Sequence, residues 1–139
     1  MSPYSFERFP GEPILLFTFT GKIDHTTILQ AFLDGNPLIE AVAADGFTRI
    51  YSLLDMRGTE VTFADVIQIV RRTKEFFWEG QAVSNFQPFI IGTGAMLKLY
   101  VEIIRQENNF GLQIPMTTTI EDALAAARKM IVEAARTDA

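Results

Sequence analysis

Cysteine is absent from this chain of 139 residues, and histidine occurs once, at His25. Without cysteine there is no disulfide, no thiolate nucleophile and no cysteine-bound metal. A single histidine excludes histidine-rich metal sites, and the acidic residues lack EF-hand spacing. We therefore expect neither a metal nor a cofactor. The absence of cysteine also suits a reducing compartment, which favours a cytoplasmic location.

Long apolar runs and an excess of positive charge are missing as well. The longest apolar stretches, Ile14–Phe17 and Phe89–Ile91, are far shorter than the ~20 residues of a membrane helix. The N-terminal residues show no basic segment followed by an apolar run, which argues against a signal peptide. A net charge of −5 does not attract a phosphate backbone. We expect neither a membrane nor a nucleic acid as a partner.

What is present is the composition of one globular domain. The chain is 48% hydrophobic and has the length of a single domain. No repeat, linker or low-complexity segment divides it. We therefore treat residues 1–139 as one domain.

Period-two and helical patterns alternate along the chain in the order ββαβαβαβα. The predicted strands are Tyr4–Phe9, Pro13–Thr20, Thr48–Asp55, Pro88–Gly92 and Ile114–Thr118, and the clearest helices are Phe63–Phe77, Ala95 to about Asn108, and Ile120–Ala134. A further helix follows its N-cap Asp24. It is interrupted at Asp34–Pro37, where Asn36 is the expected new N-cap.

This order predicts an α/β fold with a single mixed, mostly parallel sheet of about five strands and about four helices. Strands separated by helices pair in parallel through right-handed crossovers. The Pro10-Gly11 turn makes the first strand antiparallel to the second. Pro115 places the last strand at a sheet edge.

Polar residues and glycines gather where the predicted strands end. Ligands of open α/β sheets favour the crevice beyond the carboxyl ends of the strands. We therefore predict a candidate rim for a ligand or partner, formed by Asp24, Asp55, Arg57, Gly58, Thr59, Gly92, Thr93 and Gly94. Capping and turn formation are the alternative roles of these residues. The segment from Gly92 lacks the third glycine of a dinucleotide fingerprint, which favours a tight turn, although an anion on its amides remains an alternative.

Three consecutive aromatic residues, Phe76, Phe77 and Trp78, end the helix that begins at Phe63. Neighbouring helical residues diverge by about 100°, so the three cannot all face one core. They form a candidate interface, and a symmetric homodimer is the commonest way to cover such a patch. Ordinary core packing is the alternative.

Catalytic arrangements are not found. Asp24 and His25 are adjacent, and adjacent helical residues do not face each other. Neither Ser52 nor Ser84 has a glycine elbow or a companion histidine. We expect a protein without enzymatic activity.

The segment Leu53-Leu54-Asp55-Met56-Arg57-Gly58-Thr59-Glu60-Val61-Thr62-Phe63-Ala64-Asp65 resembles STAS domains, which occur in sulfate transporters and anti-sigma-factor antagonists. It is most similar to the divergent bacterial branch related to the sporulation anti-sigma-factor antagonist. That family has a strand ending in Leu-Asp, a glycine, then Val-Thr-Phe and a helix-opening Asp. The order of elements and the closing segment Ile120–Leu124 match as well. The resemblance implies a regulatory module that binds a protein, or a second copy of itself, through a helix face and the segment Asp55–Asp65.

The resemblance breaks at the phosphorylation site. In phospho-switched members the Asp is followed by two serines, and a partner kinase phosphorylates the second. Here Ile67 occupies that position and has no hydroxyl. We expect Ile67 to pack inward with Phe63 and Val70. A small-molecule binding protein that holds an apolar or anionic ligand at the rim remains the alternative function.

The sequence therefore predicts that phosphorylation at position 67 does not control this protein, because isoleucine cannot accept phosphate. Phosphosite mapping of protein from native cells, with partner affinity measured before and after phosphatase treatment, checks this expectation. Stoichiometric phosphate on Thr59 or Thr62 with a large change in affinity would show that the switch has moved to another hydroxyl.

Overall fold

The computed structural model of this chain describes residues 3–74, 86–106 and 114–138. Its elements are β1 (Tyr4–Arg8), β2 (Ile14–Lys22), α1 (His25–Asp34), α2 (Asn36–Ala44), β3 (Ile50–Glu60), α3 (Phe63–Lys74), β4 (Phe86–Ile91), α4 (Ala95–Gln106), β5 (Met116–Thr117) and α5 (Ile120–Asp138). The predicted α/β architecture is confirmed. The described residues form five helices instead of about four, since α1 and α2 are separate helices.

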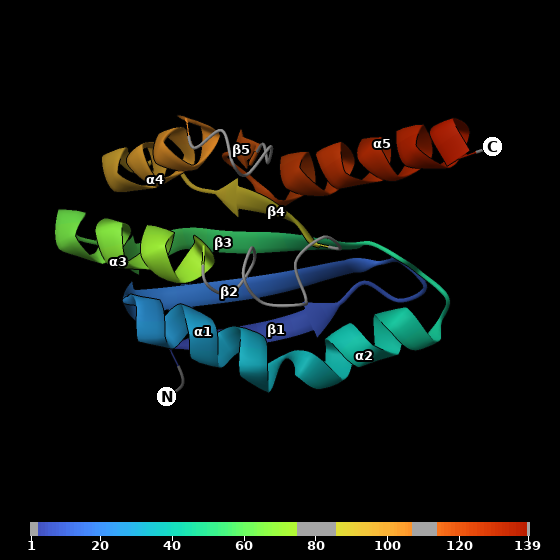
Figure 1. Cartoon of the computed structure of the whole chain (residues 1–139), viewed down its shortest axis with the longest axis horizontal. Helices are drawn as coiled ribbons and strands as arrows, with labels where there is room; N and C mark the ends of the chain where they lie inside the picture. Colours follow the sequence, from blue (N-terminus) through green and yellow to red (C-terminus); the bar gives the residue numbers. More distant parts are fainter. Residues whose placement is uncertain (1–2, 75–85, 107–113, 139) are drawn as a thin grey trace.

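The five strands form one sheet in the order β1-β2-β3-β4-β5 (Figure 1). β1 is antiparallel to β2, and the other pairs are parallel, as predicted. Because the parallel strands follow each other in chain order, right-handed crossovers place the connecting helices α1 to α4 on one face. α5 follows the last strand and covers the opposite face, where it contacts β3 and β4.

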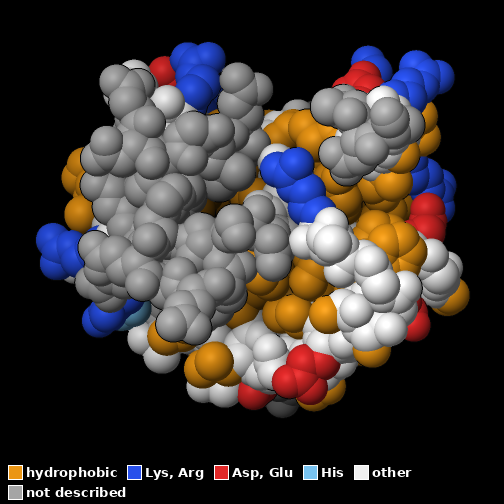
Figure 2. Space-filling model, turned by 45° about the vertical axis from the view of Figure 1, so that its right-hand side comes forward, with side chains coloured by type: hydrophobic (Ala, Val, Ile, Leu, Met, Phe, Trp, Pro, Cys, Tyr) orange, Lys and Arg blue, Asp and Glu red, His pale blue; other side chains and the backbone are white. Residues whose placement is uncertain are grey.

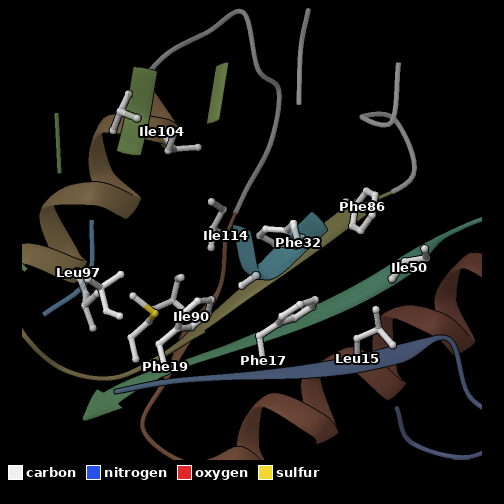
Figure 3. Packing of buried hydrophobic residues seen from close by; sticks show 14 of the residues in the cluster. Leu15, Phe17, Phe19, Phe32, Ile50, Phe86, Ile90, Leu97, Ile104 and Ile114 are labelled. Atoms are coloured by element: carbon white, nitrogen blue, oxygen red, sulfur yellow. The ribbon is translucent and has the colours of Figure 1, made fainter. Parts of the chain in front are cut away.

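The core therefore has two parts, one on each face of the sheet. The larger part lies under α1 to α4 and holds the rings of Phe17, Phe19, Phe32 and Phe86 (Figure 3). The smaller part lies under α5 and includes Leu53. β3 contributes to both parts, so successive residues along it are buried in turn on either face.

β3 is longer than predicted, because it continues past Asp55 to Glu60. Thr18 of β2 pairs with Asp55, but Thr20 pairs with Gly58, so β3 carries an extra residue between these two pairs. Such a β-bulge lets a strand change direction without leaving the sheet. Gly58 was expected beyond the strand end at Asp55, yet it is a paired residue within the strand.

β5 is shorter than predicted, since only Met116 and Thr117 pair. The amide of Ile90 donates to the carbonyl of Pro115 at 3.0 Å, and the amide of Gly92 donates to Thr117 at 2.9 Å. Alternate amides of a strand point the same way, so position 88 would donate toward the same edge. Pro88 has no amide hydrogen, which removes the bond that a longer β5 would need.

Gly35 separates α1 from α2 and is the N-cap of α2, so the prediction of Asn36 as N-cap is wrong by one residue. A Cβ at Gly35 would lie only 3.1 Å from Cε1 of Phe17, which leaves no free room for a side chain. Asn36 is the first residue of α2, and its side-chain amide donates a hydrogen bond to the carboxylate of Glu40 at 3.0 Å. Close packing against the core therefore decides where the new helix starts.

α3 buries only part of the apolar set that was predicted to face inward. Val66, Ile69 and Val70 are buried, whereas Phe63 is 61% exposed and Ile67 is 37% exposed. The expectation that Ile67 packs inward with Phe63 and Val70 is therefore wrong. α3 packs against α1 and α4, so only the stripe that faces the sheet is covered.

The predicted N-cap of α1 is confirmed, and α3 and α5 also begin with side-chain caps. Asp24 accepts a hydrogen bond from the amide of Thr27 at 2.9 Å. At α3, the Thr62 hydroxyl accepts from the amide of Asp65, and the Asp65 carboxylate accepts from the amide of Thr62, which is a complete capping box. At α5, the Thr119 hydroxyl accepts from the amide of Asp122.

Replacing the cap of α1 tests its contribution. Asp24→Ala is expected to lower the free energy of unfolding at pH 7 by about 1 kcal/mol, because the amide of Thr27 loses its acceptor. The backbone and hydroxyl of Thr27 hold the pKa of Asp24 below its usual 3.8. The folded pKa is the lower one, so the carboxylate stabilises the fold above pH 4, and this contribution is lost as the pH falls.

Asp24→Asn is the matched control, since asparagine caps equally well and has no charge to titrate. Urea titrations at pH 7 and pH 3 compare the three proteins. If Asp24→Ala lowers the free energy of unfolding by as much at pH 3 as at pH 7, this account of the carboxylate is contradicted.

Candidate functional site

A cleft of about 550 Å³ opens at the carboxyl ends of β3 and β4. Its walls are the end of β3, the turn after β4 and the first turn of α4. Five of the eight predicted rim residues line it, namely Arg57, Thr59, Gly92, Thr93 and Gly94. The structure thus brings together two segments that are far apart in sequence. Binding of a ligand by these residues stays a prediction.

The other three predicted rim residues lie outside the described lining of this cleft. Asp24 is occupied as the N-cap of α1. Gly58 pairs with Thr20 inside the sheet. Asp55 is also inside β3, and Arg57 holds its carboxylate. The sequence placed Asp55 and Gly58 at a strand end because it ended β3 too early.

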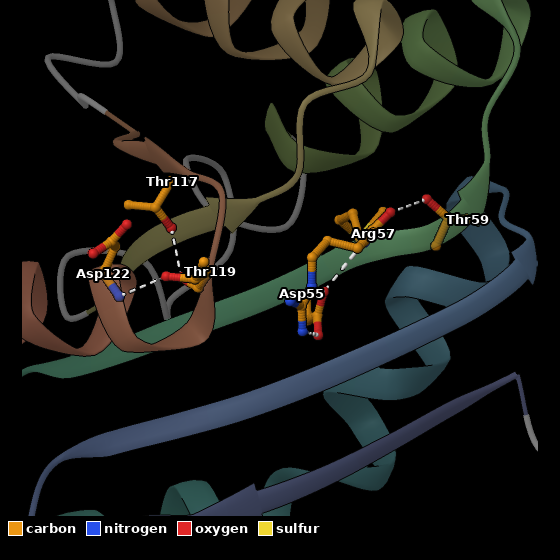
Figure 4. A network of polar contacts seen from close by, with 7 residues as sticks. Asp55, Arg57, Thr59, Thr117, Thr119 and Asp122 are labelled. Carbon is orange, nitrogen blue, oxygen red and sulfur yellow. Dashed lines mark hydrogen bonds and ion pairs between the residues drawn. The ribbon is translucent and has the colours of Figure 1, made fainter.

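Asp55 and Arg57 form a two-pronged ion pair across the bulge (Figure 4). Nε of Arg57 donates to Oδ1 of Asp55 at 2.9 Å, and an Nη donates to Oδ2 at 2.8 Å. The side chain of Asp55 is 8% exposed, and that of Arg57 is 46% exposed. Planar double contacts of this kind fix both groups. Residues two apart in a strand lie on the same face of the sheet, so Arg57 can reach Asp55.

The electrostatics of the cleft do not favour an anion. Hydrogen bonding to Asp55 raises the pKa of Arg57, and the nearby Glu121 raises it further. The charge of Arg57 is therefore already paired with the carboxylate of Asp55. Glu60 lines the same cleft and adds negative charge. The α4 N-terminus alone would have to attract an anion, so the anionic form of the rim hypothesis has little support.

The turn from β4 into α4 has the predicted tight geometry. Gly92 has a φ of 155°, and a Cβ there would lie 2.6 Å from Cδ1 of Leu97. No side chain fits at this position without displacing Leu97. On the β3 side of the cleft, the Thr59 hydroxyl donates a hydrogen bond to the carbonyl of Met56 at 2.7 Å, which stabilises the bulge (Figure 4). Packing and turn formation thus explain these residues without a ligand.

Exposed apolar residues give a second candidate site. Figure 2 shows hydrophobic side chains gathered on one face, beside the residues drawn in grey. The large hydrophobic residues that are exposed in the described chain are Leu33, Phe63, Ile67 and Val132. The predicted interface residues Phe76, Phe77 and Trp78 lie outside the described residues.

Phe63 and Ile67 are four residues apart on α3, so they are neighbours on one side of the helix. Arg71 is exposed and continues the same row. We call these three residues the α3 ridge. The sequence pattern places Phe63 and Ile67 in the core, so it does not reveal this ridge. Ile69 lies beside Val66 and Val70 at helical spacing and marks the buried face.

Within residues 3–74, 86–106 and 114–138, no three His, Asp or Glu side chains come close enough to hold a metal ion. None of the helices in these ranges combines the length and apolar character needed to cross a membrane.

The fold has counterparts among solved structures. The chain is 18% identical to an uncharacterized protein of the DUF3478 family with a SpoIIAA-like fold, from Shewanella loihica PV-4, over 88% of this chain and 89% of that chain, with a TM-score of 0.50. It is 19% identical to an anti-sigma factor antagonist from Mycobacterium paratuberculosis, over 90% and 92% of the chains, with a TM-score of 0.46. No family model and no curated protein matches the chain. The chain therefore has a SpoIIAA-like fold of the STAS type, as the resemblance in sequence predicted.

Removing the cation of the ion pair tests its role. Arg57→Leu is expected to lower the melting temperature on the order of 5–10 °C, because the buried carboxylate of Asp55 loses its positive counter-charge. The double variant Asp55→Asn/Arg57→Leu should recover much of this loss, since asparagine has no charge to desolvate. Differential scanning calorimetry measures both changes. Equal losses in the single and double variants would show that the charge of Asp55 does not matter.

Proposed function

We propose that this chain is a non-enzymatic interaction module that binds a partner protein through the α3 ridge. The partner surface that fits this ridge has an apolar pocket for Phe63 and Ile67, with an acidic group placed to meet Arg71. The observation that carries the proposal is the exposure of Phe63, at 61%, beside the exposed Ile67 on the same helix. Aromatic and arginine side chains are the residues that contribute most often to binding hot spots.

The ridge sits on a rigid support, which lowers the cost of binding. Phe63 is the first residue of α3 and lies between Thr62 and Asp65, whose capping box fixes the start of this helix. On its inner side α3 is anchored by Val66 and Val70, which are buried in the main core. Side chains that are already ordered lose less entropy on binding. The start of α3 therefore suits a preformed binding surface.

The position of the ridge supports a regulatory role without a phosphate switch. Ile67 stands where the resembled phospho-switched family has its acceptor serine. An apolar side chain there would be buried by a partner, whereas a phosphoserine would oppose burial through its charge. We infer that binding is constitutive and is set by the concentration of the partner. The same resemblance supports a bacterial regulatory protein acting in the cytoplasm.

Ridge variants test the proposal. We expect the unchanged protein to recover a partner from extracts of its own cells in a stoichiometric complex. A Phe63→Ser/Ile67→Ser variant should fail to recover this partner. The matched control is Val132→Ser on α5, which removes an apolar group that is 51% exposed away from the ridge. Quantitative mass spectrometry of the recovered complexes measures the result, and circular dichroism checks that each variant is folded.

Direct contact is checked by placing a photoactivatable phenylalanine analogue at position 63 or 132. Crosslinks to one partner from position 63 alone support the proposal. Equal recovery of the same proteins by the Phe63→Ser/Ile67→Ser variant and by the Val132→Ser control would overturn the proposal. Crosslinks only between identical chains, with sedimentation of a dimer that the ridge variant abolishes, would show that the ridge binds a second copy instead.

A further inference from the structure

A cavity of about 60 Å³ lies inside the main core, between the sheet and the helices α1, α3 and α4. Its walls are largely aromatic and aliphatic, and they include Phe19, Phe32 and Phe86. The rings of Phe32 and Phe86 meet edge to face, with their centroids 6.2 Å apart. Several of the residues around this space are visible in Figure 3. Close-packed interiors rarely leave spaces larger than a water molecule, so this cavity needs an explanation.

Ser52 of β3 brings a hydroxyl into this apolar wall. It is 1% exposed, and its Oγ makes no hydrogen bond within the described part of the chain. The residues that pair with it in the neighbouring strands are Leu15 and Pro88, and their side chains offer no polar atom. A buried hydroxyl without a partner costs about 1–3 kcal/mol. Alanine or valine would avoid that cost at this position.

The other buried polar side chains of the described chain are accounted for. Asp55 is held by Arg57, and the amide of Gln87 donates to the carbonyl of Pro88 at 3.0 Å. Ser52 is the member of this group whose hydrogen bond is missing. The exception coincides with the cavity, because Ser52 lines it.

Water does not explain this space well. One water needs about 10–15 Å³ and two to four polar partners. The cavity has room for several waters, yet among its described lining residues only Ser52 and Tyr100 carry polar side-chain atoms. A cluster of waters there would lack most of its hydrogen bonds. An apolar molecule with one polar group matches the walls and the hydroxyl better.

We propose that this cavity binds a small, mainly apolar molecule, aromatic in preference, whose single hydroxyl or N–H group pairs with Oγ of Ser52. The proposal goes beyond the interaction function of the α3 ridge. It rests on the cavity and on the missing hydrogen bond of a buried side chain, and it uses no residue of the ridge.

The path to the cavity runs through the cleft at the carboxyl ends of the strands. Met56, Val61, Met96 and Leu97 line both spaces, so they form the wall between them. Methionine is flexible and adapts to irregular gaps. A ring of the size of benzene has been accommodated in a cavity of about 150 Å³, so Met56 and Met96 must move to admit one. The cleft is thus an entrance and the cavity behind it is the binding site.

Phenol and benzene are suitable probes, because they have nearly the same shape and differ by one hydroxyl. Titrations followed by amide NMR of the full chain are expected to show shifts around Ser52, Ile90 and Leu97. Phenol should bind about tenfold more tightly than benzene, which is the usual effect of one hydrogen bond. In Ser52→Ala this preference should disappear, while benzene binds as before.

Two further variants complete the experiment. Ser52→Leu fills the space and should abolish binding of both probes, whereas Phe63→Ser on the ridge should bind them normally. The melting temperature of Ser52→Ala without probe is expected to rise, because it removes an unpaired hydroxyl. The proposal is overturned if neither probe shifts the residues of the cavity, or if Ser52→Ala still prefers phenol. Either outcome leaves the proposal for the α3 ridge untouched.

Discussion

The organisation of this protein depends on the burial of β3 on both faces. It lies between β2 and β4, with α1 to α4 on one side and α5 on the other. Of the residues from Ile50 to Met56, all but the partly buried Leu54 are buried. Any polar side chain in this strand must find a partner inside the protein, because water cannot supply one. Ser52 and Asp55 are the two polar side chains in question, and they point to opposite faces.

The two residues meet this constraint in different ways. At Asp55 the strand bulges, and Arg57 turns back onto the carboxylate, so the charge is compensated within three residues. At Ser52 no such device exists, and the hydroxyl faces a cavity. Val66 and Ile69 of α3 line that cavity, while Phe63 and Ile67 lie on the outer side of the same helix. α3 therefore separates the proposed ligand site from the proposed partner surface.

The sequence predicted the elements that depend on local patterns. The hairpin, the N-cap at Asp24, the parallel order and the resemblance at Leu53–Asp65 all follow from short segments whose chemistry acts locally. The length of β3 could not be predicted in this way, because Gly58 stays in the sheet only through pairing with Thr20 of a distant segment. The prediction was also wrong about which side of α3 is exposed. Two apolar stripes of equal spacing compete on this helix, and the packing of α1 and α4 decides between them. Ser52 was considered only as a nucleophile, since an unpaired hydroxyl has no signature in sequence.

A crystal structure of the protein with phenol tests the account most directly, because it shows the partner of Ser52. The account predicts ring density inside the cavity, with the phenol oxygen about 2.7–2.8 Å from Oγ of Ser52 and the sheet unchanged. Met56 and Met96 should have changed rotamer to admit the ring. A structure in which phenol binds only on the surface, with Ser52 bonded to a protein group in a collapsed core, would contradict it.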